Sequence, residues 1–128
     1  MNAIDTSLLV RFLLEDDADQ HARAVTIVDA GAWVSSTVAL ELEWVLRGYY
    51  GFTPERIAIV FDVLLRLRSL SFEHPVRVET ALRGLAAGLD FADAFHLASA
   101  EGQDGFATFD RTLVRRAARL PGVRAFEP

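Results

Sequence analysis

The sequence contains no cysteine and no lysine, and only three of its 128 residues are histidine. The absence of cysteine excludes a disulfide scaffold and any metal site built on thiolates, and it suits a reducing compartment. We therefore expect a cytoplasmic protein. Because all thirteen basic residues are arginines, every cationic contact must come from a planar guanidinium, which suits phosphate and carboxylate partners.

The sequence also lacks a long apolar run and a basic leader. Charged residues such as Asp62 and Arg66 interrupt the apolar stretches, so we expect no membrane-spanning segment. An acid at position 5 argues against a signal peptide. Hydrophobic residues make up 52% of the chain, which argues against disorder, and the length is typical of one domain with its own core. We therefore expect a single domain over residues 1–128.

Short apolar segments alternate with amphipathic stretches along the chain. Strands are predicted at residues 3–4, 32–35, 70–72, 106–109 and 123–126. Helices are predicted at residues 6–14, 19–30, 37–48, 54–69, 75–87, 91–101 and 111–119. Strands separated by one or two helices indicate an α/β fold with a parallel sheet that is covered on both faces.

The stretch from Asp90 to Asp110 contains three acids at the ends of predicted elements. Asp90 is a natural N-cap, whose side chain is expected to accept a hydrogen bond from the first turn, and Asp93 lies in that turn. Residues 106–109 read as a short buried strand, and Asp110 marks its carboxyl end. Each acid alone is more often a cap than a functional group, so only the set of acids indicates a site.

Sheet geometry gives that set a meaning. Asp5 ends the first predicted strand and Asp110 ends the fourth, while Glu41 and Asp93 lie in early turns of predicted helices. In open α/β folds, ligands bind outside the carboxyl ends of the strands. If these strands are neighbours, the four carboxylates converge on one rim of the sheet.

Glu41 has to be distinguished from Glu43. Glu43 is followed four residues later by Arg47, the favourable order for an exposed helical ion pair, so we expect Glu43 at the surface. Glu41 has mostly apolar residues at its helical neighbour positions and no base, which favours a ligand role over a solvated one. The alternative for Glu41 is an acid at the rim of the core.

Clustered carboxylates repel one another, and a divalent metal ion removes that conflict. Oxygen ligands without cysteine or histidine select hard ions such as Mg²⁺ or Mn²⁺. Such sites typically perform phosphoryl chemistry. The net charge of −5 argues against a simple electrostatic binder of nucleic acid, but it is compatible with a nucleic-acid enzyme whose acids are neutralised by metal.

Four segments in order then resemble PIN-domain nucleases, and most of all the VapC toxins of bacterial toxin–antitoxin pairs. They are Asp5-Thr6-Ser7 after the first strand, the stretch 38–46 around Glu41, Asp90-Phe91-Ala92-Asp93-Ala94, and Thr108-Phe109-Asp110. The resemblance implies a PIN-like three-layer sandwich, with a short, mostly parallel central sheet and helices on both faces. It also implies an Mg²⁺- or Mn²⁺-dependent endoribonuclease, normally a homodimer, that is neutralised by a cognate VapB-type antitoxin.

Transferred by position, the resemblance makes Asp5, Glu41, Asp93 and Asp110 the catalytic and metal-binding residues. Residues beside this quartet are expected to bind water or phosphate of the substrate: Thr6, Ser7, Thr108 and Arg111. Arg111 begins a run of arginines on the last predicted helix, which fits either an RNA backbone or a solvated face.

Other interpretations remain open. One is a non-catalytic PIN-like module that binds RNA or protein. Another is an aspartyl-phosphate enzyme or receiver domain that uses Asp5 as nucleophile or Asp110 as acceptor. Against it, Ser7 stands where a haloacid-type phosphatase usually carries a second aspartate, and the chain has no lysine to place opposite the acids as a receiver would. The nearly all-apolar helix over residues 57–67 indicates either a core helix or a face covered by a partner. His96 reads as a rim residue or as a contact to substrate.

Overall fold

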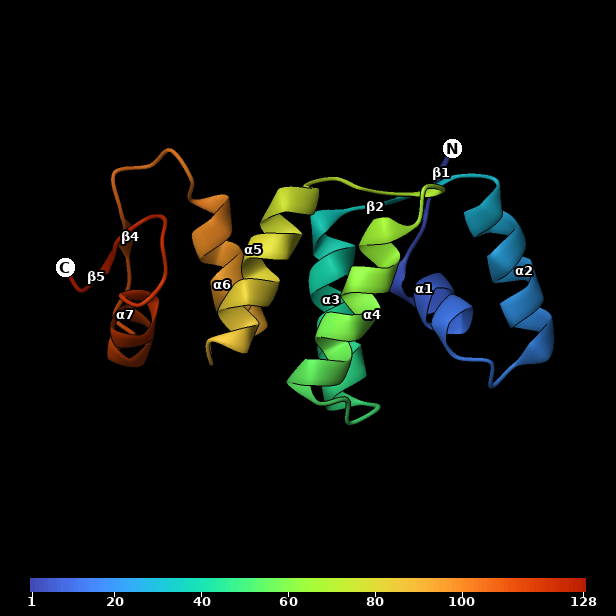
Figure 1. Cartoon of the computed structure of the whole chain (residues 1–128), viewed down its shortest axis with the longest axis horizontal. Helices are drawn as coiled ribbons and strands as arrows, with labels where there is room; N and C mark the ends of the chain where they lie inside the picture. The colour runs from blue at the N-terminus through green and yellow to red at the C-terminus, as the bar shows by residue number, and fades with distance from the viewer. The chain divides into compact units, whose positions relative to one another are not determined.

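Helices and strands alternate along the chain in the computed structural model, which describes all 128 residues (Figure 1). The chain divides into two units, Met1–Pro75 and Val76–Pro128, which are described separately. Seven helices and short parallel strands confirm the predicted α/β class. Every helix is too short or too polar to cross a bilayer.

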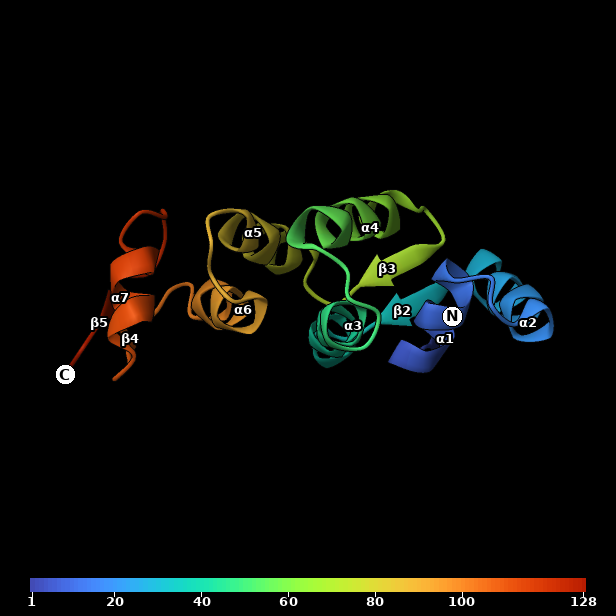
Figure 2. The same ribbon diagram turned by 90° about the horizontal axis from the view of Figure 1, so that it is seen from below.

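The first unit contains a three-stranded parallel sheet in the order β1-β2-β3. Its elements are β1 (Asn2–Ala3), α1 (Thr6–Leu13), α2 (Ala18–Asp29), β2 (Ala32–Val34), α3 (Ser36–Gly48), α4 (Pro54–Arg66) and β3 (Leu70–Phe72). Helix α4 lies against β3, as Figure 2 shows, and α1 contacts both α2 and α3. Leu9, Leu42 and Phe61, from α1, α3 and α4, are completely buried and form the centre of the core.

The second unit contains a two-stranded parallel sheet, β4-β5. Its elements are α5 (Pro75–Ala86), α6 (Phe91–Ser99), β4 (Phe106–Ala107), α7 (Arg111–Ala117) and β5 (Ala125–Phe126). Gly84 lets α5 and α6 approach closely, because a Cβ at this position would lie 2.5 Å from the Cβ of Ala94. All strand pairs are parallel, as predicted, with β1-β2-β3 in the first unit and β4-β5 in the second.

Most helices begin and end within a few residues of the positions predicted from the sequence. Thr53 caps α4 and Pro54 is its first residue, as predicted. Gly31 and Gly88 follow α2 and α5 with φ of 102° and 95°, a conformation that glycine adopts without strain. Helix α4 ends at Arg66, three residues earlier than predicted, and α3, capped by Ser35, begins one residue earlier than predicted.

The expected buried strand over residues 106–109 is mostly wrong. Only Phe106 and Ala107 pair with β5, and neither is buried. Phe109 is 80% exposed, because the chain has already left the sheet where it approaches α7. An apolar run of four residues therefore overstated the burial of this segment.

Helix α4 packs one face into the core and exposes a face that is partly polar and partly apolar. Ile57, Phe61 and Leu64 are buried, whereas Asp62 and Arg66 form an exposed ion pair. Two further apolar residues, Ile59 and Val63, lie one turn apart and are 64% and 51% exposed.

Candidate functional site

Asp5 joins β1 to α1 and is the N-cap of that helix. Its Oδ1 accepts hydrogen bonds from the Leu8 backbone N–H at 3.0 Å and from the Ser7 hydroxyl at 2.8 Å. The N–H of Leu8, followed by the Ser7 hydroxyl, lowers the pKa of Asp5 below its ordinary value, because both donors favour the charged form. The second carboxylate oxygen accepts no hydrogen bond, and Asp5 is exposed, so the carboxylate is open to a cation.

Glu41 lies in the second turn of α3 and is exposed, so the expectation that it lies on an apolar stripe is wrong. The hydroxyl of Thr6, itself buried, donates a hydrogen bond to Oε1 of Glu41. Thr6 is the residue next to Asp5, so this contact connects the start of α1 to α3. It places the Glu41 carboxylate against the residue that follows Asp5, within the first unit.

Glu43 is buried rather than at the surface, which corrects the prediction for this residue. Its exposed fraction is only 2%, because α3 turns it to the same side as the buried Leu42 and Leu46. The predicted ion pair with Arg47 is present, with Nε donating to Oε2 at 3.0 Å and a second guanidinium nitrogen donating to Oε1 at 3.3 Å. A helical i,i+4 pair is compatible with either location, so the pattern alone could not place Glu43.

Asp93 lies in the first turn of α6, half-buried and without a hydrogen bond. Burial raises its pKa above the ordinary value, and the charges of Asp90 and Asp110 raise it further, whereas His96 lowers it. Two neighbouring carboxylates thus act on Asp93, and none of the three aspartates forms an ion pair.

Asp110 is the N-cap of α7, and its Oδ1 accepts a hydrogen bond from the Leu113 N–H at 3.0 Å. Its second carboxylate oxygen accepts none. Asp90 occupies the N-cap position of α6, but its side chain makes no capping hydrogen bond, so the predicted capping contact is absent. Two members of the proposed quartet, Asp5 and Asp110, thus cap helices through their side chains, whereas Asp90 holds the N-cap position without a side-chain hydrogen bond.

The four residues predicted to touch substrate are already engaged within the chain. The hydroxyls of Thr6 and Ser7 donate to Glu41 and Asp5, and the Thr108 hydroxyl accepts from the backbone N–H of Asp110 at 3.0 Å. Arg111 pairs with Glu127 at 2.9 and 3.3 Å, although its side chain is 82% exposed. The role of Thr6 in holding Glu41 was missed, because the two residues are 35 positions apart and no local pattern connects them.

The site residues fall into two pairs, Asp5 with Glu41 in the first unit and Asp93 with Asp110 in the second. Within neither unit do three acidic or histidine side chains form a group that could hold a metal ion. The donor set nevertheless fits a hard divalent cation, because each of the four carboxylates keeps an oxygen free of hydrogen bonds and none is neutralised by an arginine.

The sequence matches the family model of the PIN domain over residues 3–120, a span that contains all four acids. The chain belongs to the PIN domain family. The PIN domain is an α/β sandwich and a nuclease-type fold that typically binds divalent metal ions. Searches of curated proteins and of solved structures gave no match.

Proposed function

We propose that this PIN domain is a metal-dependent endoribonuclease of the VapC type, which hydrolyses phosphodiester bonds of RNA. The observation that carries the proposal is the unneutralised state of four carboxylates at the positions that resemble the family's acidic quartet. Carboxylates of this kind are costly to keep together unless a cation joins them. A family that typically binds divalent ions supplies the reason for such an arrangement.

In this proposal Asp5, Glu41 and Asp93 bind Mg²⁺ or Mn²⁺, and Asp110 is a fourth ligand or acts through water. The ion, when bound, orients water and stabilises the charge that develops on the phosphate. The protein's part is orientation. The cap hydrogen bonds fix Asp5 and Asp110 at helix N-termini, and the Thr6 hydroxyl fixes Glu41.

The direct test is cleavage of a single-stranded RNA by purified protein with Mg²⁺ or Mn²⁺. Wild-type protein should cut the RNA internally, and Asp93→Asn and Asp5→Asn should each lose activity by at least about 100-fold because both are proposed ligands. Asp104→Asn, which changes an exposed acid of the second unit that makes no hydrogen bond, should keep it. Cleavage by Asp93→Asn at the wild-type rate would refute the assignment, and RNA binding without cleavage by the wild type would favour a non-catalytic module.

The toxin role, the VapB-type antitoxin and the homodimer belong to the same proposal. Ile59 and Val63, exposed one turn apart on α4, offer apolar surface that a partner can cover. Induced expression of the wild type should arrest growth of a bacterial host, and Asp93→Asn should not. Light scattering of the purified chain measures whether it forms a dimer.

A further inference from the structure

Helix α3 exposes one continuous stripe of residues at helical spacing: Thr37, Glu41, Trp44 and Gly48. These positions are separated by four, three and four residues, so they follow one another along a single face. Trp44 therefore stands one turn from Glu41, the acid to which the proposed function gives a role in metal binding. The stripe joins a carboxylate to a large aromatic ring on the same rigid element.

The side chain of Trp44 is largely exposed and forms none of the contacts that usually hold a tryptophan in a fold. Its side chain is 61% exposed, whereas the other tryptophan, Trp33, is half-buried in β2. The indole N–H donates no hydrogen bond, and the ring takes part in no aromatic pair and no cation–π contact. Tryptophan is a costly residue to leave in water, because its large apolar ring normally gains free energy by contact.

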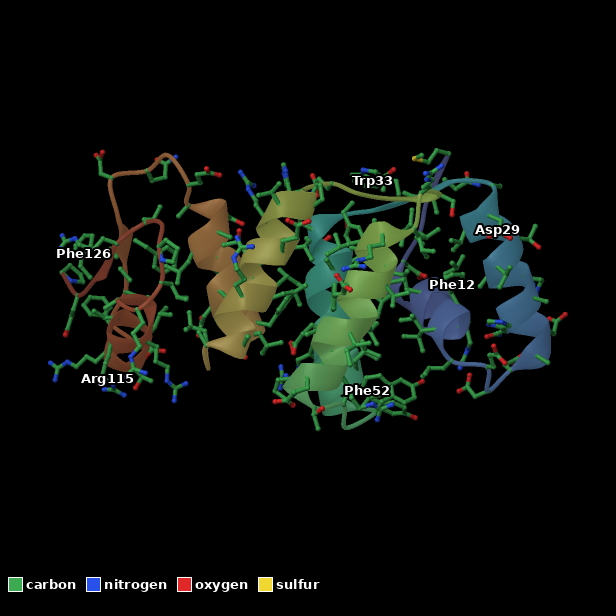
Figure 3. All side chains as sticks on the ribbon, in the orientation of Figure 1. Phe12, Asp29, Trp33, Phe52, Arg115 and Phe126 are labelled. Atoms are coloured by element: carbon green, nitrogen blue, oxygen red, sulfur yellow. The ribbon has the colours of Figure 1, made fainter.

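The neighbouring aromatic residues differ from Trp44 in this respect. Tyr49 and Tyr50 form an edge-on pair with ring centres 4.8 Å apart. Phe52, which Figure 3 marks in the turn after α3, lies beneath the guanidinium of Arg56 at 4.0 Å. The ring of Trp44 reaches along the helix to Gly48, where a Cβ would lie 3.8 Å from it, so the absence of a side chain there leaves the ring uncovered.

We infer that Trp44 is a substrate-binding residue, on which an unpaired base of the RNA stacks beside the proposed metal site. The inference rests on the proposed function, which supplies the RNA. Proteins recognise single-stranded RNA by stacking its splayed bases on exposed aromatic rings. Stacking accepts every base, so Trp44 would favour unpaired over paired RNA without selecting a sequence. The chain's net charge of −5 makes such a contact more useful, because uniform electrostatic attraction to phosphate is weak.

The test uses tryptophan fluorescence in the variant Trp33→Phe/Asp93→Asn, in which Trp44 is the only tryptophan and cleavage is blocked. Addition of a single-stranded RNA oligonucleotide should quench its emission, and a duplex of the same sequence should quench it less. In proteins that keep Asp93, Trp44→Ala should raise KM for single-stranded RNA by about 5-fold to 100-fold with a smaller change in kcat, and Trp44→Phe should recover much of the loss. Circular dichroism of each variant verifies folding.

Tyr49→Ala is the matched control. Tyr49 is an exposed aromatic residue at the end of the same helix, but five positions from Trp44, which places it on a different side of α3. Its loss should leave KM unchanged. An unaltered KM in Trp44→Ala, with wild-type cleavage intact, would overturn the inference and leave the proposed function standing. Quenching of Trp44 by RNA, together with no cleavage by the protein that keeps Asp93, would support the inference and refute the proposed function. Dissociation of a dimer by Trp44→Ala would make Trp44 a contact between copies and also overturn the inference.

Discussion

Asp93→Asn should make the metal-free protein more stable at neutral pH, although it removes a side chain from the proposed site. Burial and the charges of Asp90 and Asp110 raise the pKa of Asp93 above 3.8, so ionising it costs more in the folded chain than in the unfolded chain. The contribution of Asp93 to stability is therefore complete below pH 3.8 and is lost as the pH rises through its folded pKa. Asparagine cannot ionise and does not incur this loss.

The size of the effect follows from the partial exposure of Asp93. Interactions between exposed charges are worth about 0.2–1 kcal/mol, and because Asp93 is only half-buried the gain should be close to the upper end of this range, about 1 kcal/mol. In a chain of this length, 1 kcal/mol corresponds to a rise in Tm of roughly 3–5 °C. In Mn²⁺ the wild type should have the higher Tm. A ligand at 100 times its Kd stabilises the folded state by about 2.7 kcal/mol, and the variant, which lacks one proposed ligand to the ion, should bind it less tightly and gain less.

Thermal unfolding measures these differences in Tm. The proteins compared are the wild type, Asp93→Asn and Asp104→Asn, each in EDTA and in Mn²⁺, at pH 7 and near pH 3. In EDTA the Asp93→Asn variant should have the highest Tm at pH 7 and no advantage near pH 3. Asp104→Asn should follow the wild type throughout. A lower Tm for Asp93→Asn in EDTA at pH 7 would show that the carboxylate stabilises the fold, and the argument from electrostatic crowding would then be refuted.

Two further predictions concern the scaffold. Arg47→Ala should lower the free energy of unfolding by roughly 2–4 kcal/mol, because it leaves Glu43 buried without its ion-pair partner. Arg66→Ala breaks an exposed ion pair of the same spacing and should lower it by less than about 1 kcal/mol. Equal losses of the two variants in urea unfolding would contradict this prediction. Gly84→Ala should destabilise the protein by about 1–3 kcal/mol, because the new methyl group would overlap Ala94 of α6. Gly48→Ala would bring its methyl group only into ordinary contact at 3.8 Å and should be tolerated. A Tm of Gly84→Ala as high as that of Gly48→Ala would contradict the close packing of α5 against α6.

The order and type of the elements could be predicted because local signals determine them. The Thr53–Pro54 start of α4 and the glycines after α2 and α5 act within a single turn of chain. The same is true of the Glu43–Arg47 pair, which the spacing alone predicted. Such features depend on neighbours in the sequence, and a sequence shows its neighbours directly.

The errors concern properties that distant parts of the chain decide. Whether Glu41 or Glu43 faces the core depends on which side of α3 packs against the other helices, because two positions two residues apart lie on nearly opposite sides of a helix. The short β4 and the exposure of Phe109 depend on where α7 begins. The hydrogen bond from Thr6 to Glu41 joins residues far apart in the chain, so no spacing rule could have shown it.

The caps at Asp5 and Asp110 also alter how the acids should be interpreted. An aspartate at a helix N-terminus invites the explanation that it is only a cap, yet in both residues the cap contact uses Oδ1 alone and leaves the other oxygen free. The two roles are compatible, because the helix N–H groups orient one oxygen of each carboxylate and leave the other for a metal ion. Asparagine caps a helix nearly as well as aspartate but carries no charge. Replacement by asparagine therefore removes the metal ligand and keeps the cap, whereas replacement by alanine removes both.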